Sequence, residues 1–367
     1  MNVVIVGCGA IGAAIAYELS QVKGLDITVL DKQPPAQAST KAALGVLVGI
    51  ISQKTHGKAW LMRQLSMQRY ETLIPELEEI TARKIPFNRQ GIVMLLCEHP
   101  QENNELENWQ KLVRIRQSQG YQLEIWDRGT LKQNCPQIDE KQVMAAIYSP
   151  QDRQVDPTAL TLALVDAAGD RGVNFKFGVN VLGMSSSHTT KNICQQLETT
   201  AGKITGDWFV IAAGLGSSPL LAQSHQLIEI RPVLGQAWHL RLKQPMGNGC
   251  FQPVITGNDV HIVPASGGDY WVGATVEFPP DCSDEIVPDK QLLESIKQQA
   301  IAFCPELANA TVIRTWSGLR PRPHKRSAPV IDKLPGFSNV LLATGHYRNG
   351  ILLAPATALV IREMIVS

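Results

Sequence analysis

Residues 3–31 read VVIVGCGAIGAAIAYELSQVKGLDITVLD, and the order of apolar runs and glycines in them predicts the fold. The continuous apolar run at 3–6 is typical of a parallel strand that is covered on both faces, and residues 13–19 have helical character. Residues 27–30 form a second apolar strand of the same kind. Together these three pieces predict a βαβ unit.

Gly7, Gly9 and Gly12 lie where the first strand passes into the helix, in the pattern GxGxxG. In such a turn the first glycine allows the tight bend, the second lets a pyrophosphate approach the main chain, and the third lets the helix pack on the strand. Asp31 ends the second strand and can accept hydrogen bonds from ribose hydroxyls, which disfavours a 2′-phosphate there. The stretch therefore predicts a Rossmann-like dinucleotide site, but it does not separate NAD from FAD.

Two later apolar runs, at 208–213 and 340–344, also end on glycines, Gly214 and Gly345. Three such strands far apart in the sequence suggest one parallel sheet assembled from three segments of the chain. A long cofactor lying across the crest of this sheet would contact all three strand ends. This arrangement favours FAD over a nicotinamide coenzyme that is bound by one unit.

The composition indicates a globular protein with a substantial core. The chain has 367 residues, 44% of them hydrophobic, and a formal net charge of +1, which gives no long-range attraction for nucleic acid or an anionic membrane. The seven cysteines are scattered without a CxxC pair, so we expect reduced thiols in a cytoplasmic protein and no metal site. No basic residue precedes Lys23, which argues against a signal peptide, and the glycines and the length of the first apolar stretch argue against a membrane span.

Other segments differ from the parallel sheet. Residues 226–315 alternate apolar and polar side chains, and residues 260–276 have the pattern of a β-hairpin from an antiparallel sheet. Residues 58–80 predict helix, which Pro75 is expected to break in two. Residues 102–118 are polar and charged, and they predict a solvated helix.

These patterns predict an α/β chain, α+β overall, with two domains. A Rossmann-like cofactor domain is expected to be assembled from residues 1–85, 150–225 and 316–367. A substrate domain with an antiparallel sheet is expected to comprise residues 86–149 and 226–315.

The stretch GHYRNGILLAP at 345–355 places a histidine, a tyrosine and an arginine between two glycines, where a strand passes into an apolar helix. Gly345 and Gly350 indicate backbone with positive φ or in close approach to another group. Loops at the carboxyl ends of strands are where α/β proteins place their chemistry. We therefore expect a functional loop here.

Several ordered motifs carry a resemblance to one family over nearly the whole chain. They are GCGAIG with Asp31, VDP at 155–157, AAGLGS at 212–217, RPVLGQ at 231–236, WSGLRP at 316–321 and GHYRNGILLAPAT at 345–357. With them the chain resembles the D-amino-acid oxidase family of FAD-dependent amine oxidoreductases, and within it the glycine oxidases. The last two motifs are the specific ones. Asp156 is expected to cap a helix that begins at Pro157.

The resemblance implies non-covalent FAD, because no cysteine stands in a flavinylation motif like that of the related sarcosine oxidases. In such enzymes the Cα hydrogen of a neutral amine leaves as a hydride to flavin N5, so positioning dominates the catalysis. By the family pattern, Arg320 binds the substrate carboxylate with its planar fork. Arg348 borders the substrate and the flavin, and the helix starting near Gly350 directs its N-terminus at the flavin C2 carbonyl.

The resemblance also assigns contacts to the cofactor. The backbone from 345 to 351 is expected to approach the pyrimidine end of the flavin, and the small side chains at 39–47 to pass the pyrophosphate and the ring. Lys41, unusual for the family, is a candidate partner of a phosphate. The full set expected to contact FAD is Gly7, Gly9, Ala10, Ile11, Gly12, Asp31, Lys32, Ser39, Thr40, Ala43, Leu44, Gly45, Val181, Ala213, Gly214, Gly345, His346, Tyr347, Arg348, Asn349, Gly350 and Ile351.

Two positions depart from the family pattern. His261, the third catalytic candidate beside Arg320 and Arg348, stands where glycine oxidases usually have a tyrosine in the pocket wall. It could bond a carboxylate or an amine and, with a reference pKa of about 6.5, make the pocket sensitive to pH; equally, it could lie on the wet face of a strand. Val276 is expected to line the same pocket, where the family usually has a longer side chain. The identity of the substrate is accordingly open.

The expected function is oxidation of glycine or another small amino acid or amine to an imine that hydrolyses to an oxo acid and ammonia, with O2 as the acceptor. Two alternatives stay open: a D-amino-acid or secondary-amine dehydrogenase that passes electrons to a quinone or carrier, and a flavin-binding protein without amino-acid turnover. Nucleic acid is not an expected partner, and a homo-oligomer is left open. The resemblance also suggests thiamine biosynthesis, by analogy alone.

Overall fold

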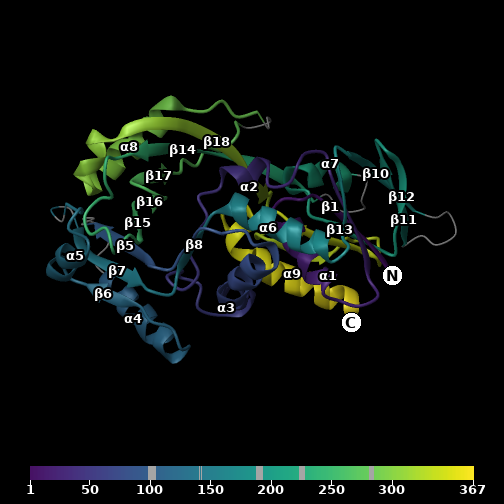
Figure 1. The fold of residues 1–367 in the computed structure, drawn as a ribbon, viewed down its shortest axis with the longest axis horizontal. Helices are drawn as coiled ribbons and strands as arrows, with labels where there is room; N and C mark the ends of the chain where they lie inside the picture. The colour runs from purple at the N-terminus through teal and green to yellow at the C-terminus, as the bar shows by residue number, and fades with distance from the viewer. Residues whose placement is uncertain (98–104, 140, 142, 187–192, 223–227, 281–284) are drawn as a thin grey trace.

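The computed structural model describes residues 1–97, 105–139, 141, 143–186, 193–222, 228–280 and 285–367. Two sheets dominate it: a six-stranded sheet covered by helices, near both chain termini, and a larger eight-stranded sheet at the other end of the molecule (Figure 1). This architecture confirms the expected α/β class.

The six-stranded sheet has the order β19-β20-β13-β1-β2-β9 and is parallel except for the antiparallel pair of β19 and β20. β20, β13 and β1 are neighbours, so the three distant apolar runs do share one parallel sheet. Val3 to Val6 and all of β20 are buried, because helices and a second sheet cover the two faces. The strands are β1 Asn2–Val6, β2 Asp26–Asp31, β9 Asn174–Phe177, β13 Trp208–Ile211, β19 Val330–Lys333 and β20 Val340–Thr344.

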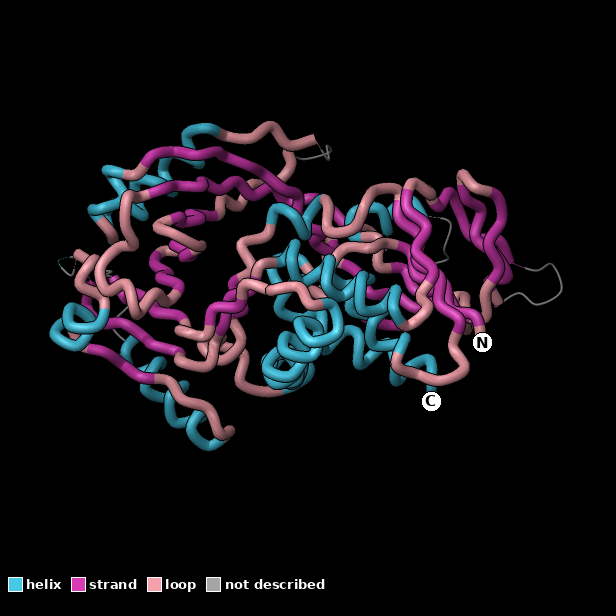
Figure 2. The backbone as a smooth tube through the Cα atoms, in the orientation of Figure 1, coloured by secondary structure: helices cyan, strands magenta, loops and turns pink. Residues whose placement is uncertain are grey.

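Helices form the layer on one face of this sheet (Figure 2). α1 packs against α6 and α9, and α9 also packs against α3. Asp156 caps α6 as expected, since its Oδ1 accepts hydrogen bonds from the backbone N–H groups of Thr158 and Ala159 at 2.8 Å, with Pro157 at the first helical position. The helices are α1 Ala10–Ser20, α3 Gly57–Thr81, α6 Pro157–Asp170 and α9 Gly350–Val366.

Smaller elements complete this part of the molecule. An antiparallel sheet shares a hydrophobic cluster with β1 and β13 on the opposite face from α1. It consists of β10 Val181–Ser186, β11 Cys194–Thr199 and β12 Gly202–Thr205, with α7 Ser217–Leu221 beside it. Short strands β3 Val46–Leu47, β4 Phe87–Asn88 and β8 Arg153–Val155 form a further sheet, and α2 Ala38–Ala42, η2 Gly214–Gly216 and η4 Tyr347–Asn349 lie at the ends of the parallel strands.

The eight-stranded sheet has the order β18-β14-β17-β16-β15-β5-β7-β6 and is antiparallel apart from the pair of β5 and β15. The expected hairpin is present as β16 and β17. The strands are β5 Ile92–Cys97, β6 Glu124–Trp126, β7 Val143–Ser149, β14 Ile230–Arg241, β15 Val254–Gly257, β16 Val260–Pro264, β17 Asp269–Gly273 and β18 Thr311–Pro323. α4 Glu105–Ser118, α5 Arg128–Asn134, α8 Lys290–Phe303 and η3 Pro305–Asn309 accompany them. The domain boundary predicted at residue 316 falls inside β18, which pairs with β14 along its length.

Two helix predictions need correction. α3 is one helix of 25 residues with Pro75 inside it, so the predicted break is wrong. Leu73 and Leu77 on either side of the proline are buried, and this packing outweighs the roughly 3 kcal/mol that an interior proline costs. α4 is solvated on one face only, because Arg116 and two apolar side chains are buried; residues 102–104 of the predicted helix lie outside the described residues.

Among the described residues, the stretch Tyr347–Val366 is long and apolar enough to cross a membrane by composition. Within the protein, 56% of its most apolar window is buried, as befits a core helix.

Candidate active site

A cavity of about 1040 Å³ lies over the carboxyl ends of β1, β2, β13 and β20 and extends to β14, β18 and the β16–β17 hairpin. Its volume is at the upper end of the range of about 300–1,000 Å³ for small-molecule sites, which indicates room for a large ligand. The predicted cofactor residues that line it are Gly7, Gly9, Ala10, Ile11, Asp31, Lys32, Ser39, Thr40, Ala43, Leu44, Gly45, Val181, Ala213, Gly214, Gly345, His346, Tyr347, Arg348, Gly350 and Ile351. Gly12 and Asn349 of the predicted set do not line it.

The glycines of the first turn play different parts. Gly7 has φ +105°, and a Cβ there would lie 2.6 Å from the carbonyl oxygen of Ala212, just after β13. A Cβ on Gly12 would lie 1.9 Å from the carbonyl oxygen of Gly7, so this glycine lets α1 pack on β1 rather than lining the cavity. Gly9 is the N-cap of α1 and faces the cavity; it has no side chain to cap the helix, and Thr40 Oγ1 accepts a hydrogen bond from the N–H of Ala10 in the first turn. The N-terminus of α1 therefore presents backbone N–H groups to an anion.

Asp31 ties the end of β2 to this turn. Its Oδ2 accepts a hydrogen bond from the backbone N–H of Cys8 at 2.6 Å, and its Oδ1 accepts one from that of Gln33 at 2.9 Å. A carboxylate has about four acceptor positions, so Asp31 retains capacity for hydroxyl donors in the cavity.

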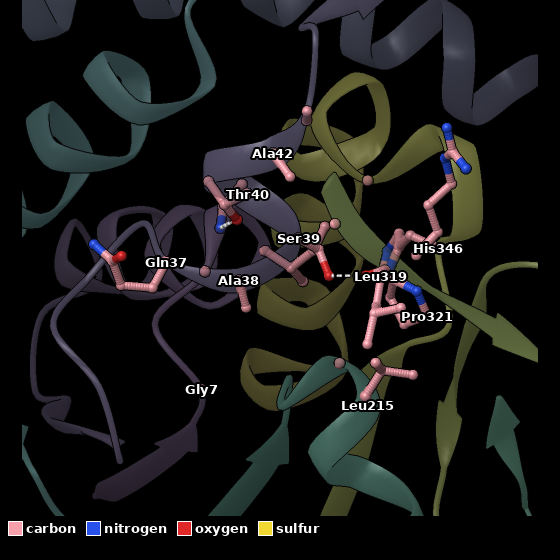
Figure 3. A pocket seen from close by; sticks show the side chains of 18 of the residues that line it. Gly7, Gln37, Ala38, Ser39, Thr40, Ala42, Leu215, Leu319, Pro321 and His346 are labelled. Atoms are coloured by element: carbon pink, nitrogen blue, oxygen red, sulfur yellow. Dashed lines mark hydrogen bonds between the residues drawn. The ribbon is translucent and has the colours of Figure 1, made fainter. Parts of the chain in front are cut away.

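Residues 37–46, apart from Lys41, line the cavity, and Ser39 joins this segment to β18 (Figure 3). Ser39 Oγ donates to the carbonyl oxygen of Leu319 at 2.6 Å, and Thr40 Oγ1 accepts from the N–H of Ala10 at 3.1 Å. Gly45 has φ +75° and lies against the backbone of Val155. Lys41 is exposed and does not line the cavity, so the structure gives no support to a phosphate contact from its ammonium.

The two glycines of the loop after β20 have different backbone conformations. Gly345 has φ +67° and packs against Pro323, whereas Gly350 is an ordinary helical residue with φ −57°, so the expected positive φ occurs only at the first. Tyr347 has φ +54°, uncommon for a residue with a side chain, and its ring lies near the guanidinium groups of Arg322 at 5.6 Å and Arg348 at 5.7 Å.

His346 is among the residues expected to contact FAD, but its ring is held inside the protein. Its ring is buried, and Nε2 is 3.0 Å from Oγ1 of Thr357 on α9. Burial lowers the pKa of His346 to about 3, so the ring is neutral at neutral pH. His346 therefore lines the cavity as part of the loop without adding a positive charge to it.

Two predicted arginines meet at the far end of the cavity. Arg320 on β18 is half-buried, and its Nη1 donates to the carbonyl oxygens of Leu234 and Thr275, both at 3.0 Å. Arg348 is 43% exposed, and its Nη1 is 4.0 Å from Oδ2 of the exposed Asp259. Burial and the nearby Arg348 both lower the pKa of Arg320. The two cations favour an anionic ligand between them.

His261 on β16 also lines this end of the cavity, as does Val276. Its Nδ1 is 2.9 Å from Oγ1 of Thr256 on the neighbouring strand β15. Desolvation lowers the pKa of His261 to about 4; the charge of Asp259 acts against this shift, and the positive charges of Arg348 and Arg320 add to it. His261 is therefore neutral at neutral pH, and the suggestion that it makes the pocket sensitive to pH near 6.5 is wrong.

The sequence prediction did not assign a role to a group of buried polar residues behind Arg320. They are Gln236, Thr275 and Glu277, together with Gly235, on which the guanidinium rests. Gly235 and Gln236 stand in RPVLGQ, so the motif pointed to the place, but only the pairing of strands shows what these residues contact.

Comparison with known proteins agrees with this geometry. The chain is 31% identical over 374 residues to the bifunctional protein ThiO/ThiG of Nostoc sp. and spans 52% of that protein's length, with all of this chain covered. It is 27% identical to the glycine oxidase of Bacillus subtilis, covering 99% of this chain and 92% of that protein. The crystal structure of glycine oxidase from Geobacillus kaustophilus superposes with a TM-score of 0.88 at 25% identity, covering 99% of this chain and 94% of that one. The family model described as FAD dependent oxidoreductase matches residues 2–364, and the chain, with its dinucleotide turn and cavity across the strand ends, belongs to that family.

Proposed function

We propose that this chain oxidises a small amino acid or amine that carries a carboxylate, with O2 as the acceptor. The observation that carries the proposal is Arg320, a half-buried guanidinium that is fixed by two main-chain carbonyls and faces a cavity built for a dinucleotide. A carboxylate is the ligand that best matches the planar fork of an arginine.

The residues of the cavity fit the FAD of this family. The N-terminus of α1, an 11-residue helix whose N-cap is a glycine that faces the cavity, suits the pyrophosphate, and Asp31 suits the ribose hydroxyls of the adenosine half. At the other end, the N-terminus of α9 has no side-chain cap, and Gly350 and Ile351 line the cavity there. This helix end would stabilise negative charge on a flavin. None of the described cysteines lines the cavity, in keeping with non-covalent binding.

FAD, when bound, supplies the acceptor for the hydride that leaves the substrate Cα. The chain's own residues then have three tasks. Arg320 binds the carboxylate and sets the orientation of Cα. Arg348 and Arg320 together disfavour a third positive charge, so they favour the neutral form of the substrate amine. His261, being neutral, adds a hydrogen-bonding wall without adding charge. The oxidised substrate is an imine, which water hydrolyses to an oxo acid and ammonia.

The test begins with the visible spectrum of the purified protein, followed by anaerobic addition of glycine, sarcosine and a panel of D- and L-amino acids. Bleaching of the flavin spectrum by one of them supports the proposal and identifies the substrate, and recovery of the spectrum in air supports O2 as the acceptor. A flavin spectrum that bleaches with none of them contradicts the proposal, and slow recovery in air with fast recovery by a quinone favours a dehydrogenase.

Arg320→Met tests the carboxylate contact directly. Removing one partner of a buried charged pair costs about 2–5 kcal/mol, so the Michaelis constant should rise by roughly 30- to 5,000-fold while FAD is retained. Arg314→Met, at an exposed arginine on the same strand, is the matched control and should leave it unchanged. An unchanged Michaelis constant in Arg320→Met would remove Arg320 from the site.

A further inference from the structure

The guanidinium of Arg320 contacts the protein in two ways, through hydrogen bonds at one nitrogen and by packing of the group on Gly235. Its Nη1 is shared between the carbonyl oxygens of Leu234 and Thr275, each 3.0 Å away. The rest of the group lies directly on Gly235, where a Cβ would stand 2.5 Å from Cζ. The direction in which Arg320 presents its remaining donors therefore depends on where the Thr275 carbonyl is held.

Thr275 belongs to a segment that follows β17 and runs back along β14. The backbone N–H of Thr275 donates to the carbonyl oxygen of Gln236 at 3.2 Å, and two further backbone hydrogen bonds join Leu234 and Glu277, at 2.9 and 3.0 Å. The hydroxyl of Thr275 accepts from the N–H of Gln236 at 2.8 Å and donates to the carboxylate of Glu277.

Glu277 is the centre of this network and is buried. Besides the Thr275 hydroxyl, its Oε1 accepts a hydrogen bond from Nε2 of Gln236 at 2.9 Å, and its Oε2 accepts one from the backbone N–H of Asp289 at 2.8 Å. Asp289 is the N-cap of α8, so the carboxylate joins the start of that helix to β14 and to Thr275. Three donors converging on a buried carboxylate fix it firmly, and its charge also favours the cationic form of Arg320.

We propose that Glu277 is a positioning residue for substrate binding: through the hydroxyl and carbonyl of Thr275 it fixes the guanidinium of Arg320 in the direction that accepts a substrate carboxylate. This inference rests on the proposed function, because it requires that Arg320 binds a carboxylate. Glu277 does not itself line the cavity.

The experiment is a double-mutant cycle on the FAD-loaded protein. The dissociation constant of acetate is measured from the change it causes in the flavin absorption spectrum, in the wild type, Glu277→Gln, Arg320→Lys and the double variant. Gln keeps the size of the side chain but removes the charge and replaces one of the two acceptor oxygens with an NH2 donor, so the three donors around Glu277 can no longer all be accepted. Lys keeps a charge and a measurable affinity but cannot span the two carbonyls and a ligand together.

We expect Glu277→Gln to weaken acetate binding at least tenfold when Arg320 is present, and less than twofold in the Arg320→Lys background. With a turnover substrate, the Michaelis constant should rise more than the limiting rate of flavin reduction falls. FAD content should match the wild type. Glu294→Gln, on the exposed face of α8, is the matched control and should change none of these.

Equal losses in both backgrounds, or no loss in either, would overturn the role of Glu277 while leaving the proposed function intact. A wild-type protein that holds FAD but binds no carboxylate would instead contradict the proposed function, and this inference with it. A general weakening of the fold would appear as lost FAD together with equal effects in both backgrounds, which is again the overturning result.

Discussion

Gly235→Ala is expected to displace the guanidinium of Arg320 without lowering the stability of the fold. Gly235 lies opposite Gly318 in the pairing of β14 with β18, and the guanidinium of Arg320 covers its α-carbon. A Cβ there would stand 2.3 Å from Nη2 and 2.5 Å from Cζ, whereas ordinary contact begins at 3.4 Å. The methyl group must therefore displace the guanidinium by about 1 Å, which the end of a flexible side chain can accommodate without moving the backbone.

A misplacement of about 1 Å can cost on the order of 100-fold in rate, or about 2.7 kcal/mol of transition-state stabilisation. We expect kcat/KM for the best substrate to fall by about this factor, while FAD content and the denaturant midpoint stay close to the wild type. The assay is anaerobic stopped-flow reduction of the flavin over a range of substrate concentrations. In an Arg320→Met background, the same substitution should add little, because the displaced group is gone.

Gly249→Ala is the matched control, since a Cβ at this exposed glycine meets nothing within 4 Å and no positive φ is required. A Gly235→Ala variant that keeps the wild-type kcat/KM would show that the methyl group does not displace the guanidinium of Arg320. An equal loss in the presence and absence of Arg320 would also contradict this displacement, since the methyl group would then act elsewhere.

Three further predictions concern the cofactor, pH and the core. Gly9→Val should give a folded protein with little bound FAD, because a branched side chain at the N-cap of α1 fills the side of the cavity that faces a pyrophosphate; a normal flavin-to-protein ratio would contradict the assignment. The pKa of His346 falls from its ordinary value of 6.5 to about 3 in the folded state, so between these pH values the unfolded chain binds more protons and the free energy of unfolding should decline as the pH falls below 6.5. In urea titrations at several pH values, His346→Gln should show a shallower decline than the wild type. Identical slopes would contradict this role of His346. Arg116→Met should lower the free energy of unfolding by about 2–4 kcal/mol, because buried Arg116 donates to the carbonyl oxygens of Ile50, Ser52 and Lys54; exposed Arg114→Met is the control, and equal effects of the two would refute the argument.

Local sequence was sufficient for the elements that carry the cofactor. The apolar runs of β1, β13 and β20 are buried on both faces, so their hydrophobicity alone indicates parallel strands, and glycines mark where each ends. The dinucleotide turn, the cap at Asp156 and the positive φ of Gly345 are each indicated by the type of one or two residues at the position itself. Such features are set within a few positions of the chain, which is why a single sequence reveals them.

Where the sequence misled, the cause was tertiary packing. Pro75 stays inside α3 because the apolar residues around it are buried. Arg116, in a segment that is polar by composition, is buried because three carbonyl groups from residues 50–54 receive its donors. These carbonyl groups are far from Arg116 in sequence, so the local pattern could not contain them.

Residue type and local spacing were sufficient for the class of fold and the dinucleotide turn, whereas Arg320, Arg348 and His261 became candidates through the resemblance of their motifs to the family. The tertiary structure decided what those side chains do. It brings the carbonyls of Leu234 and Thr275, 86 and 45 positions from Arg320, onto one nitrogen. It also places half-buried His261 near Arg348 and Arg320, where desolvation and these two positive charges lower its pKa to about 4. The orientation of the Arg320 guanidinium and the protonation state of His261 depend on groups that come close only when the strands pair, so no local sequence pattern contains them.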